Sequence, residues 1–292
     1  MPAITLTDLT FSYTAEPLLE SVSFTVVNGE RACLIGPNGC GKTTLLRLVT
    51  GDLVPRSGDA AITGVDDEAD LRAAPDVLAM RGTVGNYLDA ATASIRALQQ
   101  RFEEVNAALA DSPNAAEERR LVREFDALLA RMETVDVWGL DARIEEMLAG
   151  LGLSVLSGEE GRSRDLATLS PGQRGRLELA ATLLASPAVL VLDEPTNHLD
   201  AEAARYLSAL LADFEGPILF ASHDRAFIDE TATVLLDLDT APWQALLTAT
   251  GAGVLPGVQR CAGGYADYLE QKTAARAGHA ELHAAQQLEK KS

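Results

Sequence analysis

The sequence feature that most constrains the fold is the glycine-rich segment GPNGCGKTT at residues 36–44. It fits the pattern G-x-x-x-x-G-K-[ST] and lies between a short apolar segment, residues 31–35, and a segment with helical spacing, residues 43–50. Glycines allow backbone N–H groups to surround a polyphosphate, and the start of the following helix favours anions. The segment therefore predicts a phosphate-binding loop between a strand and a helix.

Within this loop, we expect the side chain of Lys42 to reach the β- and γ-phosphates of a nucleotide. The hydroxyl of Thr43 is expected to bind Mg²⁺. The pattern alone also occurs by chance, but its position between a strand and a helix makes chance a minor alternative. The loop residues expected to contact the nucleotide or its metal ion are Gly36, Asn38, Gly39, Cys40, Gly41, Lys42, Thr43 and Thr44.

Two carboxylates follow a second apolar segment, in the run VLVLDE at residues 189–194. The four apolar residues predict a buried strand, and Asp193 and Glu194 emerge at its carboxyl end, where ligands bind in open α/β sheets. We expect Asp193 to hold Mg²⁺, and Glu194 to polarise an attacking water as a general base or an orienting group. A strand ending in solvated acids is the ordinary alternative. The phosphate loop upstream, in the required order, favours the functional interpretation.

Two further motifs are weaker by themselves. In LSPGQ, residues 169–173, Ser170 before Pro171 predicts a helix start whose free N–H groups and hydroxyl could bind a phosphate. In ASHD, residues 221–224, His223 ends a predicted strand and could contact a γ-phosphate. Alone, the first motif is a helix cap and the second a surface or core histidine.

The spacing of apolar residues predicts an α/β fold with a mixed sheet. Strands come first, over residues 4–13, 22–27 and 31–35, and Asn28-Gly29 is expected to form a hairpin-type turn. Strands then alternate with helices, which predicts a largely parallel sheet. The elements expected there are helices over 141–150 (with Asp141 as N-cap), 171–185 and 201–213, and strands over 188–192, 218–221 and 233–238.

Residues 91–134 have a helical character of their own. Apolar residues recur at intervals of three and four on both sides of a break at residues 111–114, which predicts an antiparallel helical hairpin. Asn114 and Glu117 are expected to form a capping box at the start of the second helix. A buried helix pair is the alternative, but the charged outer positions favour a hairpin that projects into solvent. The seam residues are Ile95, Leu98, Phe102, Val105 and Leu109, then Leu121, Phe125, Leu128 and Met132.

Composition excludes several classes of protein. The 24 basic and 43 acidic residues give a net charge of −19, which argues against naked nucleic acid as a partner. Three cysteines cannot form a disulfide framework in a chain of 292 residues. The N-terminus lacks the pattern of a signal peptide, and the longest apolar stretch is too short to span a membrane. We expect no membrane insertion and a cytoplasmic location.

Together these motifs resemble the nucleotide-binding domain of ATP-binding-cassette (ABC) proteins, over residues 1–240. The phosphate loop, the LSPGQ signature, the VLVLDEP strand and the histidine occur in the family's order. The resemblance implies a P-loop NTPase fold that binds ATP and Mg²⁺ and hydrolyses ATP. It also implies that Tyr13 stacks on adenine, that Ser170, Gly172 and Gln173 contact ATP, and that Asp200 is the D-loop residue.

Within that superfamily the sequence resembles the ABC-F group, whose members are ATPases associated with the ribosome. The resemblance rests on EPTNHLD at 194–200, SHDRAFID at 222–229 and GGYADYLEQK at 263–272. It implies that the hairpin at 91–134 is the group's arm insertion and that residues 265–292 begin the inter-domain linker helix, after an irregular connection at 241–264. It further implies action on the ribosome, as a translation factor or in protection from an antibiotic.

Three features depart from the pattern of the resemblance. The family's Q-loop glutamine has no match in residues 65–80, and Pro171 replaces a glycine and removes one N–H donor. ABC-F proteins carry two nucleotide-binding domains, whereas this sequence contains one. Because the phosphate loop of one domain pairs with the signature of another across ATP, we expect a second domain as partner, supplied in trans, by a missing half, or by an ATP-dependent homodimer.

Two other interpretations remain open from the sequence. One is the ATP-binding subunit of an ABC transporter, which the missing glutamine, the arm and the linker-like tail disfavour. The other is a non-catalytic nucleotide-binding fragment that pairs with another domain.

Overall fold

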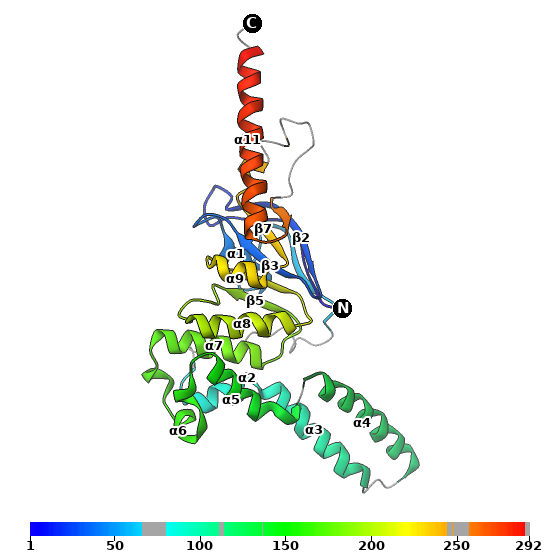
Figure 1. Cartoon of the computed structure of the whole chain (residues 1–292). Coiled ribbons are helices and arrows are strands. Elements are labelled where there is room, and N and C mark those ends of the chain that lie inside the picture. Colours follow the sequence, from blue (N-terminus) through cyan, green and yellow to red (C-terminus); the bar gives the residue numbers. More distant parts are fainter. Residues whose placement is uncertain (66–79, 111–113, 136, 244–246, 248–256, 290–292) are drawn as a thin grey trace. The chain divides into compact units, whose positions relative to one another are not determined.

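The computed structural model describes residues 1–65, 80–110, 114–135, 137–243, 247 and 257–289 (Figure 1). The chain is divided between two structural units. The first unit comprises Met1–Asp67, Ala188–Thr196 and Leu207–Ser292, and the second unit comprises Glu68–Pro187 and Asn197–Tyr206.

The first unit contains a three-stranded antiparallel sheet in the order β2-β1-β4. Its strands are β1 (Ala3–Phe11), β2 (Leu19–Val27) and β4 (Ser57–Thr63). Apolar residues alternate along β1 and β2, so that one face is buried, and Leu6 pairs with Phe24 across the two strands. The first strand ends two residues earlier than the spacing predicts, which leaves Tyr13 beyond the sheet.

A five-stranded sheet in the order β5-β6-β3-β7-β8 lies in the same unit. The first four strands are parallel and β8 is antiparallel to β7. The parallel strands are almost continuously apolar, as expected for strands covered on both faces. The strands are β3 (Arg31–Ile35), β5 (Leu190–Asp193), β6 (Ile218–Ala221), β7 (Val234–Asp237) and β8 (Gln259–Ala262).

The expected hairpin at Asn28-Gly29 is wrong, although a turn forms there. Gly29 has a φ of +75°, and the backbone N–H of Glu30 donates to the carbonyl of Val27 at 3.0 Å. The strands on either side belong to different sheets, because β3 pairs with β6 and β7 rather than with β2. The stretch 241–264, expected to be irregular, contributes β8 to the sheet edge.

One apolar core holds both sheets of the first unit together. Buried side chains from both sheets and from α1 (Lys42–Val49) form one cluster, which includes Leu9, Leu34, Leu45 and Leu236. Each such side chain stabilises the fold by about 1.5–3 kcal/mol when it is fully buried. This core fixes the strand ends from which the candidate site is built.

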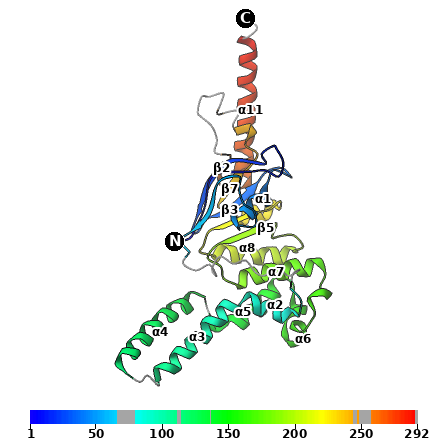
Figure 2. The same ribbon diagram turned by 180° about the vertical axis from the view of Figure 1, so that it is seen from behind.

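Helices α9 (Arg225–Thr231) and α11 (Tyr265–Glu289) also lie in the first unit, and α8 (Ala201–Asp213) belongs in part to each unit. Helix α11 contacts α9 and β8 at its beginning and then runs away from the sheet as a single long helix (Figures 1 and 2). No helix among the residues described is long and apolar enough to cross a membrane.

The second unit is helical in the part of it that the structure describes. Thr83 caps its first helix in a reciprocal capping box with Asn86. Leu140 begins α5, with Gly139 at the N-cap, so the expectation that Asp141 is the N-cap is wrong. Asp141 lies in the first turn, 3.1 Å from Arg96. The α-helices are α2 (Val84–Ala91), α3 (Ala93–Ala110), α4 (Ala115–Val135), α5 (Leu140–Gly150), α6 (Gly158–Arg162) and α7 (Pro171–Leu184).

Helices α3 and α4 lie side by side as a hairpin (Figure 2). The seam that the spacing predicts forms their contact, since Phe102 and Phe125 stack with ring centroids 4.9 Å apart. Asn114 accepts hydrogen bonds from the N–H groups of Ala116 and Glu117 and therefore caps α4. The carboxylate of Glu117 pairs with an arginine one turn further along α4.

Candidate functional site

The glycines of the phosphate loop are required by its backbone and its packing. Gly36, Gly39 and Gly41 have φ values of +146°, +82° and +103°, which disfavour any side chain. A Cβ atom on Gly36 would lie 2.8 Å from the sulfur of Cys40, and one on Gly41 would lie 2.9 Å from Leu19. The loop therefore folds as it does only with glycine at these positions.

Lys42 is the first residue of α1 and is buried inside the loop. Its ammonium group donates to the carbonyl of Gly36 at 2.9 Å and to that of Pro37 at 3.3 Å. Gly41 is the N-cap, and no side chain caps the helix. The first-turn N–H groups of α1 are therefore left uncapped by any side chain beside a fixed positive charge, an arrangement suited to a polyphosphate.

Tyr13 and the two threonines lie at the start of α1. Thr43 is exposed, whereas Thr44 is buried and its hydroxyl lies 3.4 Å from the hydroxyl of Tyr13. The ring of Tyr13 packs edge-on against Phe11 at 4.9 Å, yet Tyr13 is 62% exposed. The structure thus places the aromatic residue predicted to stack on adenine next to the loop predicted to bind the phosphates.

Asp193 and Glu194 emerge at the end of β5, as the sequence predicts. Asp193 is exposed and is the last strand residue, paired with Ala221 of β6. Glu194 has a φ of +49°, and its backbone N–H donates to the carbonyl of Ala221 at 2.9 Å. A left-handed conformation at a residue other than glycine costs about 1–3 kcal/mol and is concentrated at functional sites. The bend turns the side chain of Glu194 toward the end of β6.

His223 meets Glu194 at the end of β6. Its backbone N–H donates to Oε2 of Glu194 at 3.2 Å, and its ring Nε2 lies 3.3 Å from Oε1. The ring contact lacks hydrogen-bond geometry, so Oε1 is buried without a donor among the described residues. A buried carboxylate oxygen without a donor is costly, and it is suited to accept a hydrogen bond from a bound water.

The thiols near the site are unreactive. Burial raises the pKa of Cys40 above its ordinary value and raises that of Cys33, on β3, to about 12. Both side chains are therefore protonated at neutral pH, and neither is a candidate nucleophile.

The signature residues belong to the second unit. Ser170 and Gln173 form a capping box at the start of α7: the N–H of Gln173 donates to the Ser170 hydroxyl at 3.2 Å, and the N–H of Ser170 donates to the Gln173 side chain at 3.0 Å. A Cβ on Gly172 would lie 3.4 Å from His198. Asp200 accepts a hydrogen bond from the N–H of Ala203 at 2.9 Å at the start of α8.

The predicted site residues therefore form two groups. The loop, the carboxylates, His223 and Tyr13 lie in the first unit, and Ser170, Gly172, Gln173 and Asp200 lie in the second. The stretch in which the Q-loop glutamine has no match is residues 65–80. Of these, residues 66–79 lie outside the described part of the chain.

The donors in the first unit fit a magnesium ion that arrives with a nucleotide. No group of three or more His, Cys, Asp or Glu side chains suited to a metal occurs in the described part of the chain. Thr43 and Asp193 offer one hydroxyl and one carboxylate, both exposed. Mg²⁺ is commonly held by one or two such protein ligands together with substrate phosphates and water.

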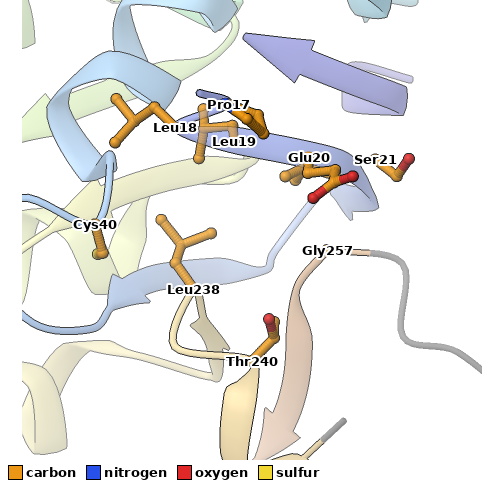
Figure 3. Close-up of a pocket in the computed structure, with 10 residues that line it drawn as sticks. Pro17, Leu18, Leu19, Glu20, Ser21, Cys40, Leu238, Thr240 and Gly257 are labelled. Carbon is orange, nitrogen blue, oxygen red and sulfur yellow. The ribbon is translucent and has the colours of Figure 1, made fainter. Parts of the chain in front are cut away.

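A cavity of about 450 Å³ adjoins the phosphate loop (Figure 3). The side chains of Cys40 and Leu238 face it, and Leu18, Leu19 and Thr240 also line it. Its volume is in the range of small-molecule pockets. No local sequence pattern indicates this cavity, because its walls come from segments far apart in the chain, which include β2, the loop and the segment after β7.

The fold and this arrangement of residues define a nucleotide-binding domain of the ABC type. The family model described as "ABC transporter" matches residues 19–197, and the chain belongs to that family. Several of its curated relatives are ABC-F proteins. It is 35% identical to the tylosin resistance ATP-binding protein TlrC of Streptomyces fradiae over 94% of this chain and 46% of TlrC.

Two further relatives have similar identities. The ATP-binding protein Uup of Haemophilus influenzae is 32% identical over 82% of this chain and 35% of Uup. The energy-dependent translational throttle protein EttA of Mycobacterium tuberculosis is 32% identical over 76% of this chain and 38% of EttA. The chain thus spans less than half the length of these relatives.

Solved structures share the fold. The ATP-binding subunit of an ABC transporter aligns with a TM-score of 0.58 and 21% identity, over 96% of this chain and 99% of the subunit. A bacterial Atm1-family ABC exporter with ATP bound aligns with a TM-score of 0.59 and 19% identity, over 98% of this chain and 42% of the exporter chain.

Proposed function

We propose that this chain is one ATP-hydrolysing half of an ABC-F type protein that acts on the ribosome. The observation that carries the ATPase part is the shared edge of one parallel sheet: β3 leads to Lys42, β5 to Glu194 and β6 to His223. The ribosomal part is supported by relatives whose names refer to translational throttling and to tylosin resistance.

In the proposed reaction, Glu194 orients a water molecule and accepts its proton as the water attacks the γ-phosphorus of ATP. The bond between that phosphorus and the bridging oxygen to the β-phosphate breaks, and ADP and phosphate result. Lys42 and the N-terminus of α1 hold the phosphate charge, and His223 contacts the γ-phosphate. Bound Mg²⁺, held by Thr43 and Asp193, would neutralise charge on the β- and γ-phosphates.

The chain supplies two different half-sites for ATP. The first unit offers the phosphate loop and the carboxylates, and the second unit offers the signature residues at the start of α7. We propose that a second nucleotide-binding domain completes each half-site, with the signature of one domain facing the phosphate loop of the other. ATP binding would then bring the two domains together, and hydrolysis would release them.

Transporter-subunit function receives support from the fold alone, because the matching solved structures are less than 25% identical. TlrC, at 35% identity, and EttA, at 32% identity, carry names linked to drug resistance and to translation, so the ribosomal proposal is preferred.

Sedimentation with ribosomes tests the proposal. The Glu194→Gln variant is expected to bind ATP without turning it over, so it should pellet with ribosomes in the presence of MgATP and stay in the supernatant without it. The double variant with Lys42→Ala is the control and should not pellet in either condition. Pelleting that does not depend on ATP, or no pelleting by Glu194→Gln with MgATP bound, would contradict ribosomal action by this chain.

A further inference from the structure

A buried polar cluster lies at the end of β7, outside the candidate site. Asp237 is fully buried, and its Oδ2 accepts hydrogen bonds from the indole of Trp243 at 2.9 Å and the hydroxyl of Tyr268 at 3.0 Å. The ammonium of Lys272 lies 2.9 Å from the same oxygen. The other carboxylate oxygen accepts the backbone N–H of Asp239 at 2.9 Å.

Lys272 is the centre of this cluster, which we call the joint and define as Asp237, Asp239, Trp243, Tyr268 and Lys272. Its ammonium donates to the Tyr268 hydroxyl at 2.8 Å and pairs with Asp239 at 2.9 Å. Burial lowers the pKa of Lys272, but hydrogen bonds to Asp239, Tyr268 and Asp237 outweigh it and leave the pKa above its ordinary value. The joint therefore keeps the buried Lys272 side chain in its charged form, paired with two carboxylates.

The joint connects α11 to the strand that borders the phosphate loop. Tyr268 and Lys272 lie on α11, and Asp237 ends β7. The next residue, Leu238, donates its N–H to the carbonyl of Ile35 at 3.0 Å. A Cβ on Gly36 would lie only 3.6 Å from the backbone nitrogen of Asp239. The backbone that anchors α11 thus packs directly against the first glycine of the loop.

A second attachment ties the start of α11 to the element after His223. The backbone N–H of Tyr265 donates to Asp229 of α9 at 2.6 Å, and the guanidinium of Arg225 lies over the Tyr265 ring at 5.3 Å. Asp224 caps α9 directly after His223. Helix α11 is therefore attached both to the segment that follows His223 and to the backbone that packs against Gly36.

We propose that Lys272 and Tyr268 are positioning residues that couple α11 to nucleotide occupancy of the phosphate loop. Buried ion pairs contribute little net stability compared with apolar packing, so stability alone gives little reason for a charged joint here. A geometrically fixed charge network instead gives α11 one defined orientation on β7. The inference rests on the proposed nucleotide binding and is independent of the ribosomal part of the proposed function.

Hydrogen exchange of the backbone amides over residues 265–272 tests this coupling, with and without a non-hydrolysable ATP analogue and Mg²⁺. In the parent chain, we expect the nucleotide to slow exchange there by at least threefold. Lys272→Met should abolish the nucleotide effect while the chain still binds the analogue. Arg276→Met is the matched control: it removes a cation one turn further along α11 that is 63% exposed, and it should keep the effect.

A second variant and a spectroscopic readout keep the test independent of folding defects. Tyr268→Phe removes one hydroxyl and no charge, and it should reduce the nucleotide effect at least twofold.

In a Trp138→Phe background, the emission of Trp243 reports the joint directly, and its wavelength should shift on nucleotide binding in the parent but not in Lys272→Met. The proposal is overturned if bound nucleotide does not change hydrogen exchange in the parent chain. It is also overturned if the nucleotide effect survives in Lys272→Met. Ribosome pelleting plays no part in this test.

Discussion

Replacing Glu194 by glutamine separates the proposed chemistry from the architecture of the site. The change keeps the shape of the side chain and removes its ability to take a proton from water. Loss of a positioned general base lowers turnover by about 10²–10⁴-fold, which corresponds to about 3–5 kcal/mol on the barrier. ATP affinity should stay within about threefold of the parent, because Lys42 and the loop glycines are unchanged.

The same substitution should slightly stabilise the fold. Oε1 of Glu194 is buried without a hydrogen-bond donor among the described residues, and an uncharged amide costs less to bury there than a carboxylate, by about 1–3 kcal/mol. The lost pairing with His223, whose side chain is 56% exposed, offsets this by about 0–1 kcal/mol. A net gain of about 1 kcal/mol would raise the melting temperature by about 2 °C in a chain of this size.

Two assays on one preparation measure the two effects. The rate of phosphate release at saturating ATP gives turnover, and dye fluorescence during heating gives the melting temperature. The conservative variant Glu194→Asp is the control, because it keeps the charge and shortens the side chain. Turnover of Glu194→Gln within tenfold of the parent would refute the role given to Glu194. A fall in melting temperature of more than about 2 °C would refute the claim that burying the Oε1 charge without a hydrogen-bond donor is costly.

The remaining predictions concern the loop and the joint. Lys42→Ala should weaken ATP binding by at least 100-fold in a fluorescent-nucleotide titration; unchanged affinity would count against the phosphate-loop assignment. Gly36→Ala should destabilise the chain by about 1–3 kcal/mol in chemical denaturation, because of its φ of +146°, whereas Gly175→Ala, which meets no atom within 4 Å, should not destabilise it. The pKa values of Lys272 and Tyr268 are both raised, so the stability that charged Lys272 contributes is complete below about pH 10 and is lost only above it. Exchange at residues 265–272, corrected for intrinsic rates, should therefore be constant from pH 6 to 9, and a transition in that window would contradict the charge assignment.

The local motifs of this chain could be predicted from sequence because their signals are local. A strand, a glycine-rich loop and a helix follow one another within residues 31–50, and the seam of the α3–α4 hairpin repeats every three or four residues. Ser170 also caps α7 as its neighbour Pro171 suggests. In these cases, the interaction that fixes the structure lies within one or two turns of chain.

Errors arose where distant pairing decides the structure. Asn28-Gly29 is a good hairpin signal, but β3 pairs instead with β6 and β7, which lie almost two hundred residues further along the chain. The expected N-cap at Asp141 is a separate, local error, because a 3-10 turn at Val137–Gly139 leads directly into α5, which begins at Leu140. The joint was not found, because Asp237 and Lys272 look like solvated charges when each is considered alone. One signal was available: Asp237 ends an apolar strand, just as Asp193 does, and this position could have marked it as a residue with a role.

The measurement that tests the central claim most directly is the sedimentation coefficient of Glu194→Gln with and without MgATP. In the proposed arrangement, ATP joins the phosphate loop of one domain to the signature of another. At concentrations well above the dissociation constant for ATP, we expect MgATP to convert a monomer into a dimer, and we expect Lys42→Ala or Ser170→Arg to prevent the conversion. A chain that binds MgATP and remains monomeric at every concentration would contradict pairing between copies and would leave completion of the half-sites to a different domain. A dimer that forms equally without nucleotide would contradict the role given to ATP.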